Sequence, residues 1–430
     1  MIETMSALHV KYLLVGGGLA ASSAAEAIRA IDRQGDMLLV GQEVNRPYHR
    51  PPLSKEFLRR DKGRSELWVK PTGWYEENDV VLRTGRRVAN LDCPRRAVTL
   101  SSGEEIGFDR LLLATGAAPR PMDIPGAELP NVFYLRTIED ADRIQHAIDQ
   151  AKAAGRTHAR GGRGHAVVIG GGVLGVELAA SLTQTGLQVD LVTARYPWEK
   201  FAGESTARFI TRYLESKGVT VHTGHRPQRL EGDGRVQRVV LPTGETIACD
   251  FVCAATGITV NREILRGTPI AAERAILADE RCRTNVEDVY AAGDCAAVFD
   301  PLFGKHRLLD HWDNAQVTGK IAGTNMAGGE ARYDAVNYFF SDVFDLSLSG
   351  WGESRQVSHR LTRGTPTPES PDMVEIGIAA DGRIAQVLAV NHAGEDEVLR
   401  ELVKRRVRVE GREEALKDPS RSLANLLDLA

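Results

Sequence analysis

Long apolar runs are missing from this sequence of 430 residues, and none approaches the roughly 18 consecutive apolar residues of a membrane-spanning helix. The amino-terminal stretch MIETMSALHVKYLLV carries an acidic residue and lacks the basic start and long apolar segment of a signal or transit peptide. The sequence therefore predicts a cytoplasmic protein.

Concentrated positive charge is lacking as well. The formal net charge is −4, which does not favour a nucleic-acid partner, because affinity for phosphate depends on clustered basic residues. Residue composition is ordinary for a globular protein, and the length predicts two or three domains. Neither a membrane partner nor a metal site is predicted.

Cysteine is scarce, and its odd number and irregular spacing predict reduced thiols. The five residues are Cys93, Cys249, Cys253, Cys282 and Cys295. Cys249 and Cys253 fall in a segment that reads as one strand, where four residues span about 13 Å, too far for a disulfide. We therefore interpret both as buried small side chains.

A glycine-rich turn organises the start of the chain. Residues 12–40 read as a strand (YLLV), a turn, an alanine-rich helix and a second strand (MLLV). Gly16 suits the tight turn, Gly18 lets backbone amides approach a pyrophosphate, and Ala21 takes the last, tolerant position. Glu43 follows the second strand, where it can accept hydrogen bonds from ribose hydroxyls. This pattern predicts a dinucleotide site.

The run RPYHRPPLSK, residues 46–55, carries a more specific signal. It resembles the FAD-dependent ferredoxin and rubredoxin reductases, a family that also includes apoptosis-inducing factor and monodehydroascorbate reductase. The resemblance extends from about Val10 to about Gly352, because further motifs recur in order. It implies that the first glycine turn holds FAD and that the segment from Arg50 to Lys55 runs alongside the flavin.

Two further segments resemble the family's motifs at the crossings between domains. Thr115 and Gly116 belong to an Ala-Thr-Gly motif where the chain leaves the FAD domain beside the cofactor, and a second such motif ends at Gly257. Gly293 and Asp294 resemble the family's Gly-Asp motif, in which the carboxylate binds a ribityl hydroxyl of FAD. A purely structural Asp cap is the alternative.

Trp312 lies at the start of an expected helix, HWDNAQVTGKIAGTNMAG. In the resembled family this helix directs its positive amino end at the flavin pyrimidine, where it stabilises negative charge. The indole either stacks on a ring system or packs in the core.

A second glycine turn has the complete spacing. Gly170, Gly172 and Gly175 stand between a strand (AVVI) and a helix, and a further strand ends at Val192. Two such units in one chain indicate two nucleotides, and the resemblance assigns this one to NAD(P)H.

The residue after the second strand of this unit differs in charge from Glu43. Arg195 stands where an acidic residue is expected, and it can meet a 2′-phosphate that a carboxylate would repel. This predicts a moderate preference for NADPH over NADH. The alternative is that Arg195 is solvated and Glu199 reads the ribose.

Lys55 and Glu177 are the catalytic candidates. We expect Ser54 to cap a helix that begins KEFLRR, which places Lys55 in a first turn where the helix dipole disfavours its charge. Glu177 is expected in the first turn of the helix after the second glycine turn. In the resembled family the matching residues form an ion pair beside the flavin and the nicotinamide. Taken alone, Glu177 could simply rest on the dipole, and Lys55 could be solvated.

Two segments outside these motifs leave alternatives open. Thr137 is expected to cap an amphipathic helix, and the following GRTHARGGRGH is either a phosphate-binding or an exposed loop. Near the end, a basic cluster either faces an acidic partner or is a solvated helix end. Its members are Lys404, Arg405, Arg406 and Arg408.

The expected fold is α/β, with two Rossmann-like dinucleotide-binding domains and a C-terminal α+β domain. The boundaries place the FAD domain at 1–120 and 249–330, the NAD(P) domain at 121–248 and the interface domain at 331–430. Flavoenzymes of the disulfide type carry a Cys pair in the first domain, and none occurs between Val10 and Leu91.

The expected reaction is hydride transfer from NADPH or NADH to FAD, followed by electron transfer to a ferredoxin-like or rubredoxin-like protein, a quinone or oxygen. The alternative is a binding protein like apoptosis-inducing factor, whose slow reduction controls its association. A homodimer is left open.

Overall fold

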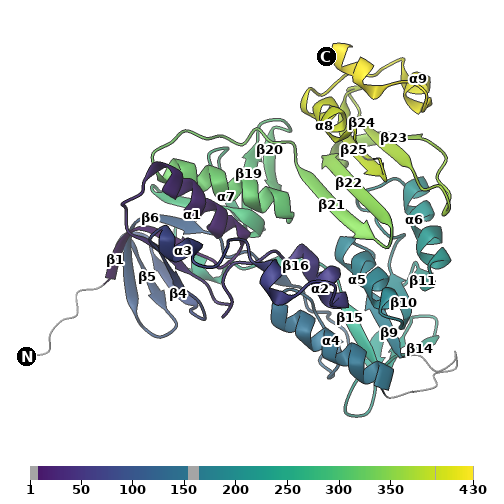
Figure 1. Cartoon of the computed structure of the whole chain (residues 1–430), viewed down its shortest axis with the longest axis horizontal. Helices are drawn as coiled ribbons and strands as arrows, with labels where there is room; N and C mark the ends of the chain where they lie inside the picture. The colour runs from purple at the N-terminus through teal and green to yellow at the C-terminus, as the bar shows by residue number, and fades with distance from the viewer. Residues whose placement is uncertain (1–7, 154–163, 393, 430) are drawn as a thin grey trace, which may run out of the picture. The chain divides into compact units, whose positions relative to one another are not determined.

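The computed structural model describes residues 8–153, 164–392 and 394–429. Most of the GRTHARGGRGH segment, and with it the phosphate-binding interpretation, lies outside these residues. The chain divides into two compact units, the first formed by residues 1–49, 64–118 and 259–337 and the second by residues 50–63, 119–258 and 338–430 (Figure 1). Among the described helices, none has the length and apolar character needed to cross a bilayer.

The first unit is built on a mixed seven-stranded sheet with strand order β3-β2-β1-β6-β5-β4, in which β18 also pairs with β6. Its strands are β1 (Leu8–Val15), β2 (Met37–Val40), β3 (Val80–Arg83), β4 (Val88–Asp92), β5 (Ala97–Leu100), β6 (Glu105–Leu113) and β18 (Val289–Ala291). The pairs involving β1, β2, β3 and β18 are parallel, whereas β4 and β5 are antiparallel to their neighbours. The apolar β2 is buried throughout, as a covered parallel strand requires.

Helices α1 (Leu19–Ile31) and α7 (Trp312–Met326) of this unit lie side by side, as Figure 1 shows. Two glycines of α7 permit this approach. A Cβ at Gly319 would lie 2.3 Å from the carbonyl oxygen of Ala20, and one at Gly323 would lie 2.3 Å from that of Ala24. Small residues on both helices thus permit close contact between them.

Shorter elements complete the first unit. They are η2 (Arg64–Leu67), α3 (Trp74–Glu77), η3 (Glu263–Leu265), η4 (Gly293–Cys295) and a small sheet of β17 (Ile276–Ala278), β19 (Ala296–Asp300) and β20 (Lys305–Leu308). Strands β7 (Ala117–Pro119) and β16 (Ile258–Val260) lie where the chain passes from one unit to the other.

The second unit contains a parallel five-stranded sheet with order β11-β10-β9-β15-β8. These strands are β8 (Val132–Phe133), β9 (His165–Ile169), β10 (Gln188–Thr193), β11 (Val219–Thr223) and β15 (Phe251–Ala254), with helices α4 (Ile138–Ala153), α5 (Val173–Gln184) and α6 (Glu204–Ser216). An antiparallel sheet of β12 (Arg229–Glu231), β13 (Arg238–Val240) and β14 (Thr246–Ala248) follows α6 and β11 in the chain. Thr137 caps α4 as predicted, since its hydroxyl accepts the Asp140 N–H at 3.2 Å.

The C-terminal part of the second unit is an antiparallel sheet with order β21-β22-β25-β24-β23. Its elements are β21 (Tyr338–Val343), β22 (Leu346–Gly352), η5 (Ser354–Gln356), β23 (Val357–Arg363), β24 (Met373–Ala379), β25 (Ile384–Val390), α8 (Asp396–Lys404), α9 (Glu413–Lys417) and η6 (Leu423–Leu429). The segment 50–63 contributes η1 (Pro51–Ser54) and the four-residue helix α2 (Glu56–Arg59). The expected α/β fold with two nucleotide-binding sheets and a C-terminal α+β domain is confirmed.

Candidate active site

The first glycine turn fits a pyrophosphate. Gly16 has a φ of 137°, and a Cβ there would lie 2.0 Å from the carbonyl oxygen of Ala114, so only glycine closes this turn. A Cβ at Gly18 would meet nothing within 4 Å, which leaves open space at the amino end of α1. Ala21 is fully buried and is accommodated in the helix. Backbone N–H groups at this helix end are suited to bind a phosphate anion.

Glu43 follows β2 by three residues, beyond the carboxyl end of the strand. Its carboxylate accepts a hydrogen bond from the buried Tyr48 hydroxyl, while its backbone carbonyl accepts the Gly85 N–H at 2.8 Å. The side chain is partly exposed, and it lies beyond the carboxyl end of a parallel strand, where open α/β sheets bind ligands.

The first Ala-Thr-Gly motif is tied to the strand that re-enters the unit. The hydroxyl of Thr115 donates to the Asn261 carbonyl at 2.7 Å, and the Asn261 side chain donates to the Thr115 carbonyl at 2.9 Å. Gly116 has a φ of 66° and accepts the Asn261 N–H at 3.0 Å. These bonds fix the crossing at the end of β6.

The Gly-Asp motif lies between β18 and α7. Gly293 has a φ of 74°, and its N–H donates to the Thr318 hydroxyl of α7 at 3.0 Å. A Cβ at Gly293 would lie 3.0 Å from that of Ala20 on α1. Asp294 is therefore held in a short 3-10 turn beside the first glycine turn, at the carboxyl end of a parallel strand. This is where open α/β sheets bind ligands.

Trp312 is the first residue of α7, as the sequence predicted. Its indole N–H donates to Nδ1 of His49 at 3.0 Å, and the two rings lie 5.6 Å apart between centroids. Burial raises the pKa of the neighbouring Asp313 carboxyl. The amino end of α7 thus combines an aromatic ring with the positive end of a helix dipole.

The second glycine turn repeats the backbone of the first. Gly170 has a φ of 121°, and a Cβ there would lie 2.3 Å from the Ala255 carbonyl oxygen. A Cβ at Gly172 would meet nothing within 4 Å, whereas one at Gly175 would lie 1.8 Å from the Gly170 carbonyl oxygen. The turn therefore offers open space for a phosphate and needs glycine for helix contact.

Gly257 ends the second Ala-Thr-Gly motif with a φ of 104°. Its carbonyl accepts the Arg120 N–H at 2.9 Å, and the Thr256 hydroxyl donates to the Arg120 carbonyl at 2.8 Å. The Arg120 guanidinium also donates to the Thr256 carbonyl. The same pattern of hydrogen bonds holds this crossing and the one at Thr115.

Arg195 lies in the loop after β10, and 77% of its side chain is exposed. The guanidinium lies 3.5 Å from Glu199, whose other carboxylate oxygen accepts the Tyr196 N–H at 3.0 Å. Both residues considered as readers of the coenzyme ribose are therefore neighbours in one loop.

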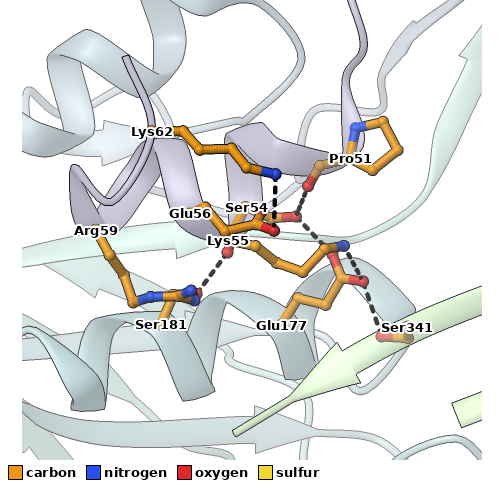
Figure 2. Close-up of polar contacts among 9 residues, drawn as sticks. All are labelled: Pro51, Ser54, Lys55, Glu56, Arg59, Lys62, Glu177, Ser181 and Ser341. Atoms are coloured by element: carbon orange, nitrogen blue, oxygen red, sulfur yellow. Dashed lines mark hydrogen bonds and ion pairs between the residues drawn. The ribbon is translucent and has the colours of Figure 1, made fainter. Parts of the chain in front are cut away.

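Lys55 and Glu177 form an ion pair, with Nζ and Oε1 at 2.8 Å (Figure 2). Only 6% of each side chain is exposed. The same Glu177 oxygen accepts the Ser341 hydroxyl of β21 at 2.8 Å, and Oε2 accepts the Ser54 hydroxyl at 2.5 Å. The ring of Phe340 faces the ammonium at 5.7 Å. Three donors thus satisfy one buried carboxylate, which is the condition for burying an ion pair.

Two expectations about this pair are wrong. Ser54 does not cap α2, because its hydroxyl is directed at Glu177 and the residue before the helix is Lys55, which makes no side-chain cap. Glu177 lies in the second turn of α5 rather than in its first, since the helix begins at Val173. The pairing of opposite charges, not a helix dipole, therefore explains both placements.

Sequence reasoning missed Ser181 and Ser341 near the pair and gave Ser54 another role. The Ser181 hydroxyl donates to the Ser54 carbonyl at 2.6 Å and accepts from Arg59 at 3.2 Å, which fixes segment 50–63 against α5 (Figure 2). Arg50 donates to the Arg136 carbonyl at 2.6 Å in the same region. Ser54 lies within the RPYHRPPLSK motif, but Ser341 stands 164 positions from Glu177, and only tertiary structure reveals it.

The cysteines have no disulfide partners: all five thiols are free. Cys249 lies between β14 and β15 rather than in one continuous strand, which corrects the expected element. Burial raises the pKa of both Cys249 and Cys253, in the latter to about 12, so neither thiol ionises at neutral pH. Inert buried thiols are consistent with chemistry carried by other groups.

The basic cluster at the end of α8 is engaged within the unit. Arg405 lies 3.2 Å from Glu401, Arg406 donates to Gln356 at 2.9 Å, and Arg408 lies 2.6 Å from Glu410. These contacts favour the solvated helix end over a surface for an acidic partner.

Comparisons with known proteins cover nearly the whole chain. The family of pyridine nucleotide-disulphide oxidoreductases matches residues 10–319, and the reductase C-terminal family matches residues 338–427. The biphenyl dioxygenase system ferredoxin–NAD(+) reductase component of Paraburkholderia xenovorans (strain LB400) is 30% identical over 429 residues, which cover 99% of each chain. Rhodocoxin reductase of Rhodococcus erythropolis is 31% identical over 364 residues, 82% of this chain and 80% of that protein.

Solved structures of reductases also match nearly the whole chain. The reductase in the crystal structure of the covalent putidaredoxin reductase–putidaredoxin complex matches with a TM-score of 0.89 and 27% identity, over 97% of this chain and 98% of that one. The ferredoxin reductase for the CYP199A2 system from Rhodopseudomonas palustris also gives 0.89 and 27%, over 98% and 100% of the two chains. The chain therefore belongs to the pyridine nucleotide-disulphide oxidoreductase family, in agreement with the resemblance to its FAD-dependent reductases.

Proposed function

We propose that this protein is an FAD-dependent NAD(P)H reductase that passes electrons to a small ferredoxin-like or rubredoxin-like protein. The observation that carries the proposal is the buried ion pair between Lys55 and Glu177, in which Glu177 lies on the helix that follows the second glycine turn. A structural ion pair alone would not require two glycine turns with open space at Gly18 and Gly172. Together these features supply two nucleotide sites and a fixed charge pair.

One set of residues would bind the two nucleotides, and the Lys55–Glu177 pair would place a charge beside them. FAD, when bound, accepts the hydride of NAD(P)H and releases its two electrons one at a time. The first turn, Glu43 and Asp294 would hold FAD, and the second turn would hold NAD(P)H. Glu177 keeps the Lys55 ammonium in one position, so that its charge is preorganised rather than solvated. Each NAD(P)H then yields one oxidised nicotinamide and two reduced one-electron acceptors.

The acceptor is proposed from the relatives. The matched proteins are named as ferredoxin, rubredoxin and rhodocoxin reductases. The alternative of a binding protein like apoptosis-inducing factor is not favoured, since these relatives are named as reductases. A cytoplasmic location stays a prediction.

The test begins with the cofactor. The purified protein should be yellow and release FAD on denaturation, and release of FMN alone would contradict the assignment of the first turn. Asp294→Ala should lower the bound FAD, because a ribityl contact is lost. Undiminished flavin in that variant would show that the Gly-Asp motif has another task.

Turnover with NADH and NADPH then separates the candidate functions. A reductase should reduce ferricyanide and a purified [2Fe–2S] ferredoxin at many turnovers per second, within the usual range of about 1 to 1,000 s⁻¹. Rapid reduction of ferricyanide without reduction of either ferredoxin or rubredoxin would refute the proposed acceptor. Slow reduction followed by a change in association would instead favour the binding protein.

A further inference from the structure

The loop between β10 and α6, residues 194–203, holds both residues that are candidates to read the coenzyme. We call it the coenzyme loop, and its interpretation rests on the proposed function, because it is assigned to the adenosine end of NAD(P)H. Arg195 and Glu199 lie in its exposed part. A loop that discriminates ribose from its 2′-phosphate needs a fixed backbone, since hydrogen-bond readout depends on geometry.

Trp198 anchors the middle of this loop. The residue is fully buried, and its φ of 66° is unusual for a bulky side chain. The backbone N–H of Trp198 donates to the Gly171 carbonyl at 2.8 Å, which connects the loop directly to the second glycine turn. The backbone is thus held in a sparsely populated conformation by its surroundings.

Part of those surroundings comes from the C-terminal sheet. The Trp198 ring lies 6.0 Å from Phe201 and 6.0 Å from Phe339 of β21, and the two phenylalanine rings are 5.2 Å apart. Aromatic pairs at such separations stabilise beyond the burial of area alone. The loop therefore packs on a strand that is distant in sequence and lies outside the nucleotide-binding sheet.

Glu375 of β24 holds the other end of the coenzyme loop. Only 1% of this residue is exposed, and both its carboxylate oxygens accept the Gly203 N–H, at 2.9 and 3.0 Å. The same carboxylate accepts the Thr206 hydroxyl at 2.5 Å and the Arg360 guanidinium at 2.7 Å. A Cβ at Gly203 would lie 2.7 Å from the Arg360 side chain, so glycine permits the approach. A buried negative charge here is stabilised by the amino end of α6.

Strand β21 connects this anchor to the catalytic pair. Phe339 and Ser341 are two residues apart on the strand and so point to the same face. Phe339 contacts Trp198 of the coenzyme loop, whereas Ser341 donates to Glu177 at 2.8 Å. One face of the C-terminal sheet thus contacts the elements assigned to both ends of NAD(P)H.

We propose that Glu375 is a positioning residue for the coenzyme: it fixes the coenzyme loop from the C-terminal sheet and thereby sets the affinity for the adenosine end of NAD(P)H. The residue lies on β24 of the C-terminal sheet and acts through Gly203 and Thr206. The C-terminal domain then serves coenzyme binding as well as contributing Ser341 to the ion pair.

The test is Glu375→Gln in the FAD-bound full-length protein, which removes the charge and one acceptor while keeping the shape. The KM for NADH and for NADPH and the dissociation constant of ADP-ribose should each rise about tenfold. The rate of flavin reduction at saturating coenzyme should stay within about twofold, because the Lys55–Glu177 pair is untouched. Glu353→Gln is the matched control, since that carboxylate is also buried in this domain but accepts the Arg355 N–H at 3.0 Å.

An unchanged KM and ADP-ribose affinity in Glu375→Gln would overturn the proposal, as would an equal loss in Glu353→Gln. If Glu375→Gln does not fold, Thr206→Val decides in its place: weaker ADP-ribose binding supports the proposal and wild-type binding overturns it. A wild-type protein that binds no ADP-ribose and oxidises neither coenzyme would instead refute the proposed function itself.

Discussion

The two glycine turns share the same backbone geometry. In each, the first glycine has a positive φ and closely approaches the carbonyl of an alanine, Ala114 in one and Ala255 in the other. Each alanine begins an Ala-Thr-Gly motif whose threonine is tied to the strand crossing beside it. The repeated turn provides a general site for a pyrophosphate, so the difference between FAD and NAD(P)H must come from side chains.

The side chains differ at matching places. Ala21 of the first turn corresponds to Gly175 of the second, and two residues later Ser23 corresponds to Glu177. Beyond the second strand, the acidic Glu43 contrasts with the basic Arg195. Only the second helix therefore carries a buried carboxylate, and that carboxylate has a lysine partner. Under the proposed function, both turns bind a nucleotide, and only the helix after the second turn also holds a buried ion pair.

The largest effect is expected from Lys55→Met. Without the ammonium, Glu177 retains two hydroxyl donors but no opposite charge, so flavin reduction should slow about a hundredfold while FAD stays bound. Stopped-flow reduction at saturating NAD(P)H measures this rate. Lys62→Met is the control, because its ammonium lies 3.3 Å from Glu56 in the same segment and is 40% exposed. A wild-type rate in Lys55→Met would remove Lys55 from the reaction.

Exchanging the residues at the third motif position should have unequal effects in the two turns. Gly175→Ala places a Cβ 1.8 Å from a backbone oxygen, so α5 must shift, and kcat/KM for NAD(P)H should fall about a hundredfold. The reverse change, Ala21→Gly, should cost only about 0.5–1 kcal/mol in helix stability and leave FAD bound. Steady-state kinetics and flavin content measure the two effects. Equal tolerance at both positions would contradict the asymmetry.

A smaller effect, on the choice of coenzyme, is expected from changing Arg195, the residue that matches Glu43 in the second unit. Arg195→Ala should lower the ratio of kcat/KM for NADPH to that for NADH by about tenfold, since a charged hydrogen bond to the 2′-phosphate is lost. Glu199→Gln tests the competing reader, and a selective loss with NADH would assign the ribose to Glu199. Two matched relatives are named as NAD(+) reductases, so a preference for NADPH would distinguish this protein from them. An unchanged ratio in Arg195→Ala would refute the predicted preference.

The sequence predicted the parts of the fold that local rules determine. Both glycine turns, their flanking strands and the cap at Thr137 follow from spacing and from backbone conformations that few residues adopt. The opposite charges of Lys55 and Glu177 were predicted to pair through resemblance, and the structure confirms that pairing. The roles of the cofactor-binding residues stay predictions.

Other features were inaccessible because they depend on contacts distant in sequence. No local pattern marks Ser341 or Glu375, since each acts on residues more than a hundred positions away. The Ser54 cap failed for the same reason: a serine before a helix usually caps it, but a buried carboxylate competed for the hydroxyl. A tertiary partner thus overrode the local preference of Ser54 for a helix cap.

The two nucleotide-binding sheets also differ in their cores. Strand β2 is apolar throughout, whereas β10 carries Asp190 at the place of Leu38. Nε2 of His165 and of His222 each lie 2.5 Å from a different oxygen of this carboxylate. Burial raises the pKa of Asp190, but hydrogen bonds from the two imidazoles outweigh it and bring the pKa down to about 2.

This buried cluster predicts a modest dependence of stability on pH. A carboxyl whose folded pKa is lowered stabilises the protein above its unfolded pKa of about 3.9, and the contribution is lost as pH falls toward the folded value. At neutral pH, Asp190→Asn should therefore reduce the free energy of unfolding in urea by about 2 kcal/mol, and roughly half of that difference should remain at pH 3. The control is Asp109→Asn, whose carboxylate pairs with His9 while both side chains are more than half exposed, so little change is expected. A difference between wild type and Asp190→Asn that does not shrink below pH 4 would show that the ionised carboxylate does not stabilise the second sheet.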